Sequence, residues 1–148
     1  MELYVQYNEI CEFYEHGEDD CADWHEEYSY EIISVSLNTQ HINYEEDKFT
    51  VNFTCVEGEP VYVLYMTYSE GDSFGSATGK GQILWVFKNE ELALNALEHW
   101  KLGTTYDNEQ EHIKFTVDGN RQISLYNETY SYFTNIEDLK IQKFNVIN

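Results

Sequence analysis

Apolar and polar side chains alternate with a period of two through most of the apolar runs of this chain. Residues 2–14 follow this alternation and favour a strand, with a helix as the alternative for the second half of the run. Residues 28–37 alternate in the same way but shift phase between Ile32 and Ile33, which indicates a β-bulge or a strand buried on both faces. The period of two therefore restricts the chain mainly to β-structure.

Further strands are predicted along the rest of the chain. The alternation continues in residues 48–56, whereas residues 61–68 and 82–88 are more uniformly apolar, as is typical of central strands. Residues 112–126 hold two alternating runs on either side of an Asp-Gly-Asn turn, which is a hairpin signal. Residues 138–148 are compatible with a last strand.

The periodicity changes to that of a helix in residues 89–102. Asn89 is suited to be the N-cap, acidic residues occupy the first turn, and Gly103 follows as a stop signal. The length of the chain is close to that of one domain. We therefore expect a single domain, residues 1–148, of the α+β class, in which this principal helix packs on one face of a mainly antiparallel β-sheet.

Charge restricts the partners of such a domain. The chain has 28 Asp and Glu residues against 8 Lys and Arg, a formal net charge of -20. Residues 1–47 hold 14 of these acids and no Lys or Arg, so they carry -14 of that charge. A field of this sign repels nucleic acid and anionic membranes, and it accelerates encounter with basic proteins. We expect a basic protein partner, in particular a nucleic-acid-binding enzyme, and no direct contact with nucleic acid or membrane.

The cellular location and cofactors are also constrained. No apolar run approaches the about 18 residues of a membrane span, and the first residues lack the features of a signal peptide, so a cytoplasmic protein is expected. Three cysteines cannot all pair within one chain, which favours reduced thiols. Cys11, His16, Cys21 and His25 offer atoms that zinc prefers but lack the C-x2-C spacing of specific zinc sites. No metal or other cofactor is expected.

Residues 71–81 hold four glycines and a single lysine between two strand-like runs. A phosphate-binding P-loop needs G-x-x-x-x-G-K followed by Ser or Thr and a helix. Here the spacing is one residue short, Gly81 takes the place of the Ser or Thr, and a strand follows. A long hairpin loop is therefore favoured over a nucleotide cradle. The candidate partner contacts in this loop are Asp72, Ser73, Phe74 and Lys80.

The segment "YMTYSEGDSFGSATGKGQILWVFKNEELALNAL" adds a resemblance. It resembles small, largely uncharacterised proteins of phages and prophages, in which a strand, a "GDSFG" loop, a "WVF" strand and a helix follow in order. The resemblance covers about a quarter of the chain, within residues 61–100, and implies a phage-like origin. It carries over no catalytic residue. Ser73 lies in no G-x-S-x-G elbow, and an enzyme is not expected.

The acidic segment before residue 32 also carries aromatic residues, which interface centres favour. Residues 23–31 are interpreted either as a half-buried strand or as a docking surface for a basic groove. Residues 15–27 are expected to form a loop or a short helical turn. The candidate partner contacts in this part of the chain are Glu18, Asp19, Asp20, Asp23, Trp24, Glu26 and Glu27.

These features predict an acidic phage-type inhibitor that binds and blocks a host nucleic-acid-processing defence enzyme, of the anti-CRISPR or anti-restriction type, with carboxylates in place of phosphates. An immunity protein against a nuclease toxin would use the same physics. A third hypothesis is a sponge that binds a signalling nucleotide through the glycine-rich segment. Dimerisation through an exposed edge strand is a further possibility.

Overall fold

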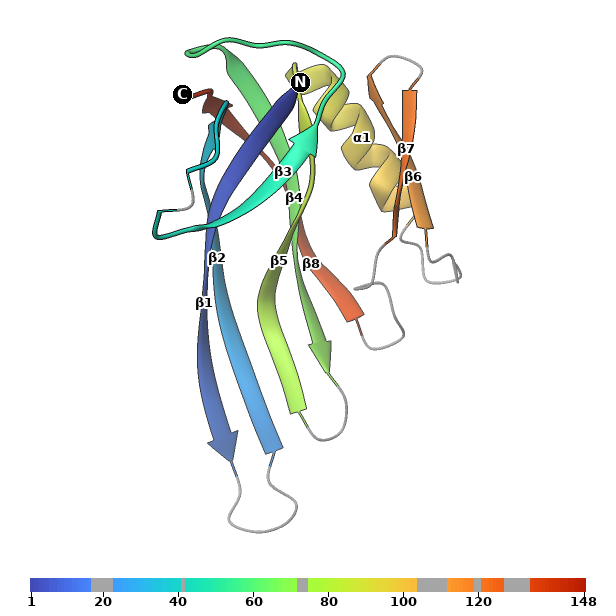
Figure 1. The fold of residues 1–148 in the computed structure, drawn as a ribbon. Coiled ribbons are helices and arrows are strands. Elements are labelled where there is room, and N and C mark those ends of the chain that lie inside the picture. Colours follow the sequence, from blue (N-terminus) through green and yellow to red (C-terminus); the bar gives the residue numbers. More distant parts are fainter. Residues whose placement is uncertain (17–22, 41, 72–74, 104–111, 119–120, 127–133) are drawn as a thin grey trace.

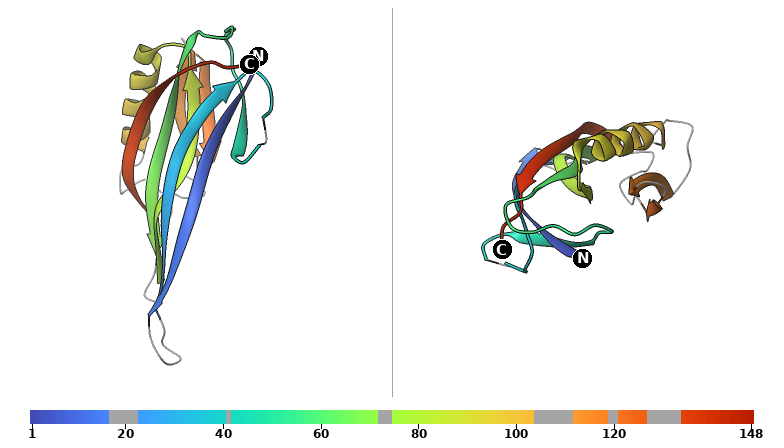
Figure 2. Two further views of the ribbon diagram at one scale, coloured as in Figure 1. Left: turned by 90° about the vertical axis from the view of Figure 1, so that its left-hand side faces the viewer. Right: turned by 90° about the horizontal axis from the view of Figure 1, so that it is seen from above.

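The computed structural model describes residues 1–16, 23–40, 42–71, 75–103, 112–118, 121–126 and 134–148 (Figure 1). Its elements are β1 (Glu2–His16), β2 (Asp23–Ser36), β3 (Glu45–Thr50), β4 (Pro60–Gly71), β5 (Gly75–Phe87), α1 (Glu90–Gly103), β6 (His112–Asp118), β7 (Arg121–Tyr126) and β8 (Thr134–Asn145). Six strands form a curved sheet in the order β3-β1-β2-β5-β4-β8 (Figure 2), and β6 and β7 form a hairpin. The fold is α+β, as the sequence predicts.

The pairing of the strands is antiparallel except between β2 and β5. There the two strands run parallel over Trp24 to Glu27 and Gly75 to Thr78. The parallel pair joins two antiparallel units, one of β3, β1 and β2 and the other of β5, β4 and β8. This single parallel pair makes the sheet mixed, which the alternation of side chains does not indicate.

The predicted bulge is confirmed. Gln6 pairs with Ser34 and Tyr7 pairs with Ile32, so Ile33 has no opposite residue on β1. The strand expected in residues 2–14 is also confirmed, and it extends to His16 without a helix. A bulge accounts for the phase shift because the extra residue moves the following side chains to the opposite face.

Three predicted boundaries are wrong. The strand expected in residues 48–56 ends at Thr50, where Val51 and Cys55 turn into the core. Residues 23–27 belong to β2 and not to an acidic loop. The glycine-rich loop is shorter than expected, because residues 75–81 form the first half of β5. In that strand Gly81 leaves room for the ring of Tyr30, since an added Cβ would lie 2.1 Å from the ring.

Two apolar clusters stabilise the sheet, one on each face. The predicted helix is confirmed as α1, which begins after Asn89, whose Oδ1 accepts a 2.9 Å hydrogen bond from the Leu92 amide. Ala93, Ala96 and Leu97 of α1 pack on β4 and β5 residues, and the β6–β7 hairpin lies beside the helix (Figure 1). The cluster on the other face contains Leu3, Val5, Ile32, Val35, Val51, Cys55, Val61, Val63, Ile83, Val86 and Val146.

The sheet continues beyond both clusters as a narrow extension (Figure 1). We call residues 8–16 of β1 and 23–31 of β2 the arm. The short strand β3 pairs only with Glu2 to Tyr7, so it does not extend along the arm. β5 runs beside β2 along the arm. None of the arm's described side chains, in residues 8–13 and 24–31, is buried.

Candidate functional site

A pocket of about 380 Å³ lies at the base of the arm. Residues of β1, β2, β3 and β5 line it. β3 pairs with one edge of β1, and β2 and then β5 follow on the other edge of β1. Carboxylates, tyrosine rings and an amide line it, and its described lining contains no Lys or Arg. We call it the tyrosine–carboxylate pocket. It is lined by Tyr7, Glu9, Tyr30, Glu45, Asp47, Gly81 and Gln82.

The strand register explains why acids and tyrosines meet here. Glu45 pairs with Tyr7 across β1 and β3, and Glu9 pairs with Tyr30 across β1 and β2. Paired residues of neighbouring strands point to the same face of a sheet. Asp47 lies two residues from Phe49, whose ring packs edge-on against a core tryptophan, so the alternation directs the Asp47 carboxylate to the core side as well.

The tyrosine rings form a row along this face. The ring centres of Tyr7 and Tyr30 are 5.3 Å apart with an angle of 35° between the planes, and Tyr30 lies 6.2 Å from Tyr65. The Gly81 amide approaches a Glu9 oxygen at 3.5 Å. Tyrosine rings and carboxylates therefore line the pocket together.

The pKa shifts at the pocket reflect burial first and neighbouring negative charge second. Burial raises the pKa of Asp47, and the Glu45 carboxylate raises it further. Burial also raises the pKa of Tyr7 to about 12, with added contributions from Asp47, Glu45 and Glu9, and burial raises that of Tyr30. None of the three carboxylates forms an ion pair with a described Lys or Arg side chain. The pocket thus lacks a counter-ion from the described part of the chain.

The raised pKa of Tyr7 predicts that the folded protein loses stability at alkaline pH. The pKa of Tyr7 is 10.0 in a model peptide and about 12 in the folded protein, so the folded state holds this proton more tightly. The resulting stabilisation is complete below pH 10 and is lost as the pH rises through 12. We expect the free energy of unfolding to fall across this range and to fall less steeply in Tyr7→Phe. Urea unfolding at several alkaline pH values measures this difference, and equal slopes in the two proteins would contradict it.

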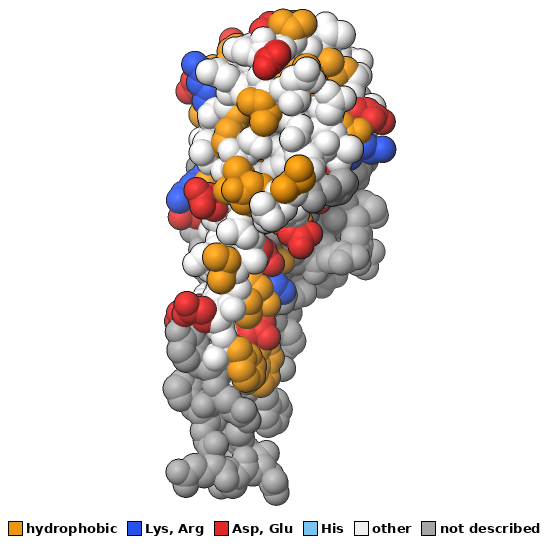
Figure 3. Space-filling view, turned by 60° about the vertical axis from the view of Figure 1, so that its left-hand side comes forward, with side chains coloured by type: hydrophobic (Ala, Val, Ile, Leu, Met, Phe, Trp, Pro, Cys, Tyr) orange, Lys and Arg blue, Asp and Glu red, His pale blue; other side chains and the backbone are white. Residues whose placement is uncertain are grey.

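The same face continues from the pocket along the arm. Alternation places Tyr7, Glu9, Cys11 and Phe13 of β1 beside Tyr30, Tyr28, Glu26 and Trp24 of β2. Phe13 is 59% exposed and Trp24 is 38% exposed, so both add accessible apolar area to this face. Figure 3 shows hydrophobic and acidic side chains interspersed along the narrow part of the molecule. We call these eight residues the acidic–aromatic face.

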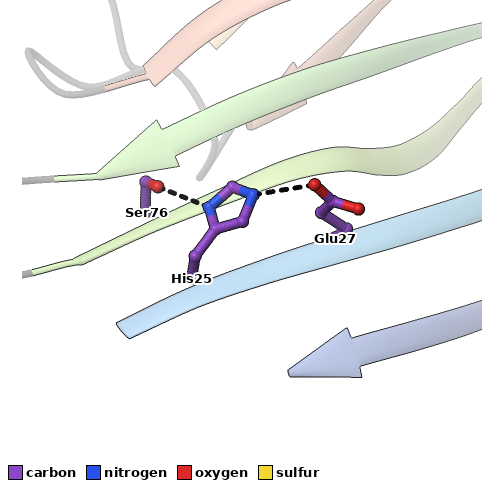
Figure 4. Close-up of polar contacts among 3 residues, drawn as sticks. All are labelled: His25, Glu27 and Ser76. Carbon is purple, nitrogen blue, oxygen red and sulfur yellow. Dashed lines mark hydrogen bonds and ion pairs between the residues drawn. The ribbon is translucent and has the colours of Figure 1, made fainter. Parts of the chain in front are cut away.

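The opposite face of the arm carries a like-charge pair and a polar link. Glu12 and Glu27, both exposed, lie directly opposite each other on β1 and β2. His25 Nδ1 lies 2.8 Å from Ser76 Oγ, and His25 Nε2 lies 3.3 Å from a Glu27 oxygen (Figure 4). With its proton on Nε2, His25 donates to Glu27 and accepts from Ser76.

Serine, histidine and glutamate in contact are also the residue types of acyl-transfer catalysis. Such a reaction needs N–H donors directed at an oxyanion beside the serine. Ser76, however, pairs with His25 of β2 on one side and with Gly71 of β4 on the other, so its main chain belongs to the sheet. We interpret this contact as a link that holds the parallel strands β2 and β5 together.

The predicted contact residues are separated by the fold. Trp24 and Glu26 lie on the acidic–aromatic face, whereas Glu27 points to the other side of β2. Lys80 belongs to β5, and its ammonium nitrogen lies 5.6 Å from the ring centre of Tyr28 and 5.9 Å from that of Tyr68. Of Asp23 only the position at the start of β2 is described. The remaining predicted contacts, which lie outside the described residues, are Glu18, Asp19, Asp20, Asp72, Ser73 and Phe74.

Sequence reasoning did not select the pocket residues. Glu9, Glu45 and Asp47 were counted only as part of the total charge, because their proximity depends on the pairing of β1 with β3. For the zinc hypothesis, Cys11 and His25 lie on opposite faces of the arm, while Cys21 is outside the described ranges. Within those ranges no group of three or more metal-ligating side chains is close enough to hold a metal ion.

Comparisons with models of protein families, with curated proteins and with solved structures find no match to this chain. In the part of the chain that the structure describes, no helix combines the length and the apolar character that crossing a membrane requires.

Proposed function

We propose that this protein is an acidic inhibitor of the phage type that binds and blocks a basic, nucleic-acid-processing defence enzyme in the cytoplasm of a host cell, as anti-CRISPR and anti-restriction proteins do. The observation that carries the proposal is the pocket at the base of the acidic–aromatic face, which is lined by three carboxylates without a described ion pair. Such a surface is complementary to a cationic groove that normally holds phosphates.

The composition of the acidic–aromatic face supports protein binding. Exposed Phe13 and Trp24 near the end of the arm provide apolar area, and aromatic residues are enriched in the centres of protein interfaces. The hydroxyl of Tyr28 donates a 2.8 Å hydrogen bond to Glu26, which holds that carboxylate in a fixed position. Fixed carboxylates bind a cationic partner at a lower cost in side-chain entropy.

The like-charge pair on the other face also supports a role in binding. Glu12 and Glu27 lie directly opposite each other on β1 and β2, and both are exposed, so they present carboxylates to a partner on this face. Glu27 also contacts His25. We assign both faces of the arm to the contact with the partner, which fits an arm inserted into a groove.

The nucleotide-sponge hypothesis receives less support. Its glycine-rich segment forms the first half of β5, which pairs with β2 over residues 75–78 and with β4, and the Gly81 amide approaches the Glu9 carboxylate. The pocket itself is lined by carboxylates, which repel phosphate groups. An immunity protein against a nuclease toxin would present the same surface, and the identity of the partner distinguishes it from an inhibitor of host defence.

The proposal is tested by capture and inhibition. Tagged protein is mixed at low salt with lysate of a bacterial host, bound proteins are eluted with a salt gradient, and the activity of the purified partner is measured with and without this protein. We expect one basic nucleic-acid-processing enzyme, loss of its activity, and an affinity that falls steeply with salt. An affinity that is independent of salt, or a partner that stays active, would contradict the proposal.

Matched variants refine this test. The double variant Glu12→Gln and Glu27→Gln should bind the partner about tenfold more weakly, while its stability changes by about 0.5 kcal/mol or less per substitution because both side chains are exposed. The control is Glu57→Gln with Glu98→Gln, which removes the same charge at exposed positions outside the arm. Equal losses in the two double variants would assign the effect to net charge and not to the arm.

A further inference from the structure

We propose that the tyrosine–carboxylate pocket binds one arginine side chain of the basic partner. This inference rests on the proposed function and specifies the chemistry of its central contact. The pocket assignment is tested with a small compound and the inhibitor function with a captured enzyme, so that either one can fail while the other holds.

The volume of the pocket fits a ligand of this size. Ligand pockets usually measure about 300 to 1,000 Å³. At about 380 Å³ this pocket is near the lower limit, which suits a single long side chain better than a nucleotide. The pocket adjoins the acidic–aromatic face, because Tyr7, Glu9 and Tyr30 belong to both. A bound segment that follows the arm therefore brings one of its side chains beside the pocket.

The acceptors of the pocket match a donor-rich cation. Glu9, Glu45 and Asp47 supply carboxylate oxygens from β1 and β3. Gln82 pairs with Met66 of the α1-side cluster, so its side chain points to the other face of the sheet and supplies no acceptor to the pocket. Guanidinium has five N–H donors, whereas ammonium has three.

The tyrosine rings favour arginine over lysine for a second reason. Guanidinium is planar and weakly hydrated, and it stacks on aromatic rings, whereas ammonium is a strongly hydrated point charge. The rings of Tyr7 and Tyr30, at 5.3 Å and 35°, form a tilted aromatic wall against which a planar group can lie. Within the described part of the chain, the nearby cation Lys80 lies over Tyr28 and Tyr68, and neither ring lines the pocket.

The probe is Nα-acetyl-arginine methylamide, titrated into the full chain while the Gly81 amide is followed by NMR. We expect saturable binding with a Kd of about 1 mM, typical of a single side chain. The corresponding citrulline compound has the same shape without the charge, and the lysine compound has the charge without the planar group. Both should bind at least about tenfold more weakly. Equal binding of citrulline and arginine compounds, or no saturation with arginine, would overturn the proposal.

Two variants locate the binding. Asp47→Asn and Glu45→Gln preserve the shape of the pocket and should each weaken arginine binding by about tenfold, whereas Glu57→Gln at an exposed turn should not change it. Amide spectra and melting temperatures verify that the variants are folded. Undiminished binding in both pocket variants would overturn the assignment to this pocket. Tighter binding of free arginine than of the capped compound would overturn its assignment to a protein side chain.

The two proposals fail separately. If the arginine compound binds but no basic enzyme is inhibited, the pocket assignment holds and the inhibitor function is wrong. If an enzyme is inhibited but the arginine compound does not bind, the inhibitor function holds and the pocket assignment is wrong.

Discussion

Gly79→Ala is expected to destabilise the protein by about 2 to 5 kcal/mol, because two penalties act at one residue. Gly79 adopts a φ of +75°, a left-handed conformation that costs an ordinary residue about 1 to 2 kcal/mol. An added Cβ would also lie 2.2 Å from the main-chain oxygen of Tyr28. Backbone in a paired strand cannot move aside as a flexible side chain can. Urea unfolding measures the loss.

Gly58→Ala is the matched control. Gly58 has a similar φ of +92°, but no atom lies within 4 Å of the added Cβ. This variant should lose only the about 1 to 2 kcal/mol of the left-handed conformation. The difference between the variants then measures the close approach of β5 to β2. Equal losses would show that the contact between Gly79 and Tyr28 can relax, and that the path of β5 along the arm is not fixed sterically.

Leu64→Ala is expected to cost about 2 to 5 kcal/mol, the range for truncation of a buried leucine. Leu64 is 0% exposed on β4, in the cluster that also contains Ala93 and Ala96 of α1. The small alanines bring the helix close to the sheet, which leaves little freedom for the helix to fill the cavity. Each kcal/mol lowers the melting temperature of a domain of this size by about 2 to 4 °C. Calorimetry measures the shift.

Leu94→Ala provides the same chemical change on the exposed side of α1. Leu94 is 49% exposed, so its truncation should change stability by about 0.5 kcal/mol or less. Comparable losses at Leu64 and Leu94 would contradict the packing of α1 on β4. A large loss at Leu64 alone would support the orientation of α1 in which Ala93 and Ala96 face β4 and Leu94 faces away from the sheet.

The pocket illustrates a conflict between stability and binding. Burial raises the pKa of Asp47, so ionisation of this carboxylate opposes folding above its unfolded pKa. Three carboxylates near two tyrosine rings make an unfavourable arrangement for a free protein. The same arrangement becomes favourable when a cation enters, because the ligand supplies the missing charge. Local conflicts of this kind are expected at functional sites.

The sequence by itself determined most of the elements. Alternation identified β1 and most of β2, uniformly apolar runs identified β4 and the second half of β5, the phase shift identified the bulge at Ile33, and the Asn89 cap with its helical period identified α1. Each of these signals is local, since it depends on neighbours within a few residues. The total charge and its concentration before Lys48 were also fixed by the sequence.

Only the tertiary structure decided the pocket and the strand at residues 75–81. Glycine-rich sequence favours a turn locally, but pairing with β2 over residues 75–78 and with β4 holds this segment in the sheet. Likewise Glu9, Tyr30 and Asp47 are far apart in sequence and line one pocket because β1 pairs with both β2 and β3. Contacts between distant strands depend on register and sheet order, which a period of two does not encode. The amount of charge was thus a property of the sequence, and its placement was a property of the fold.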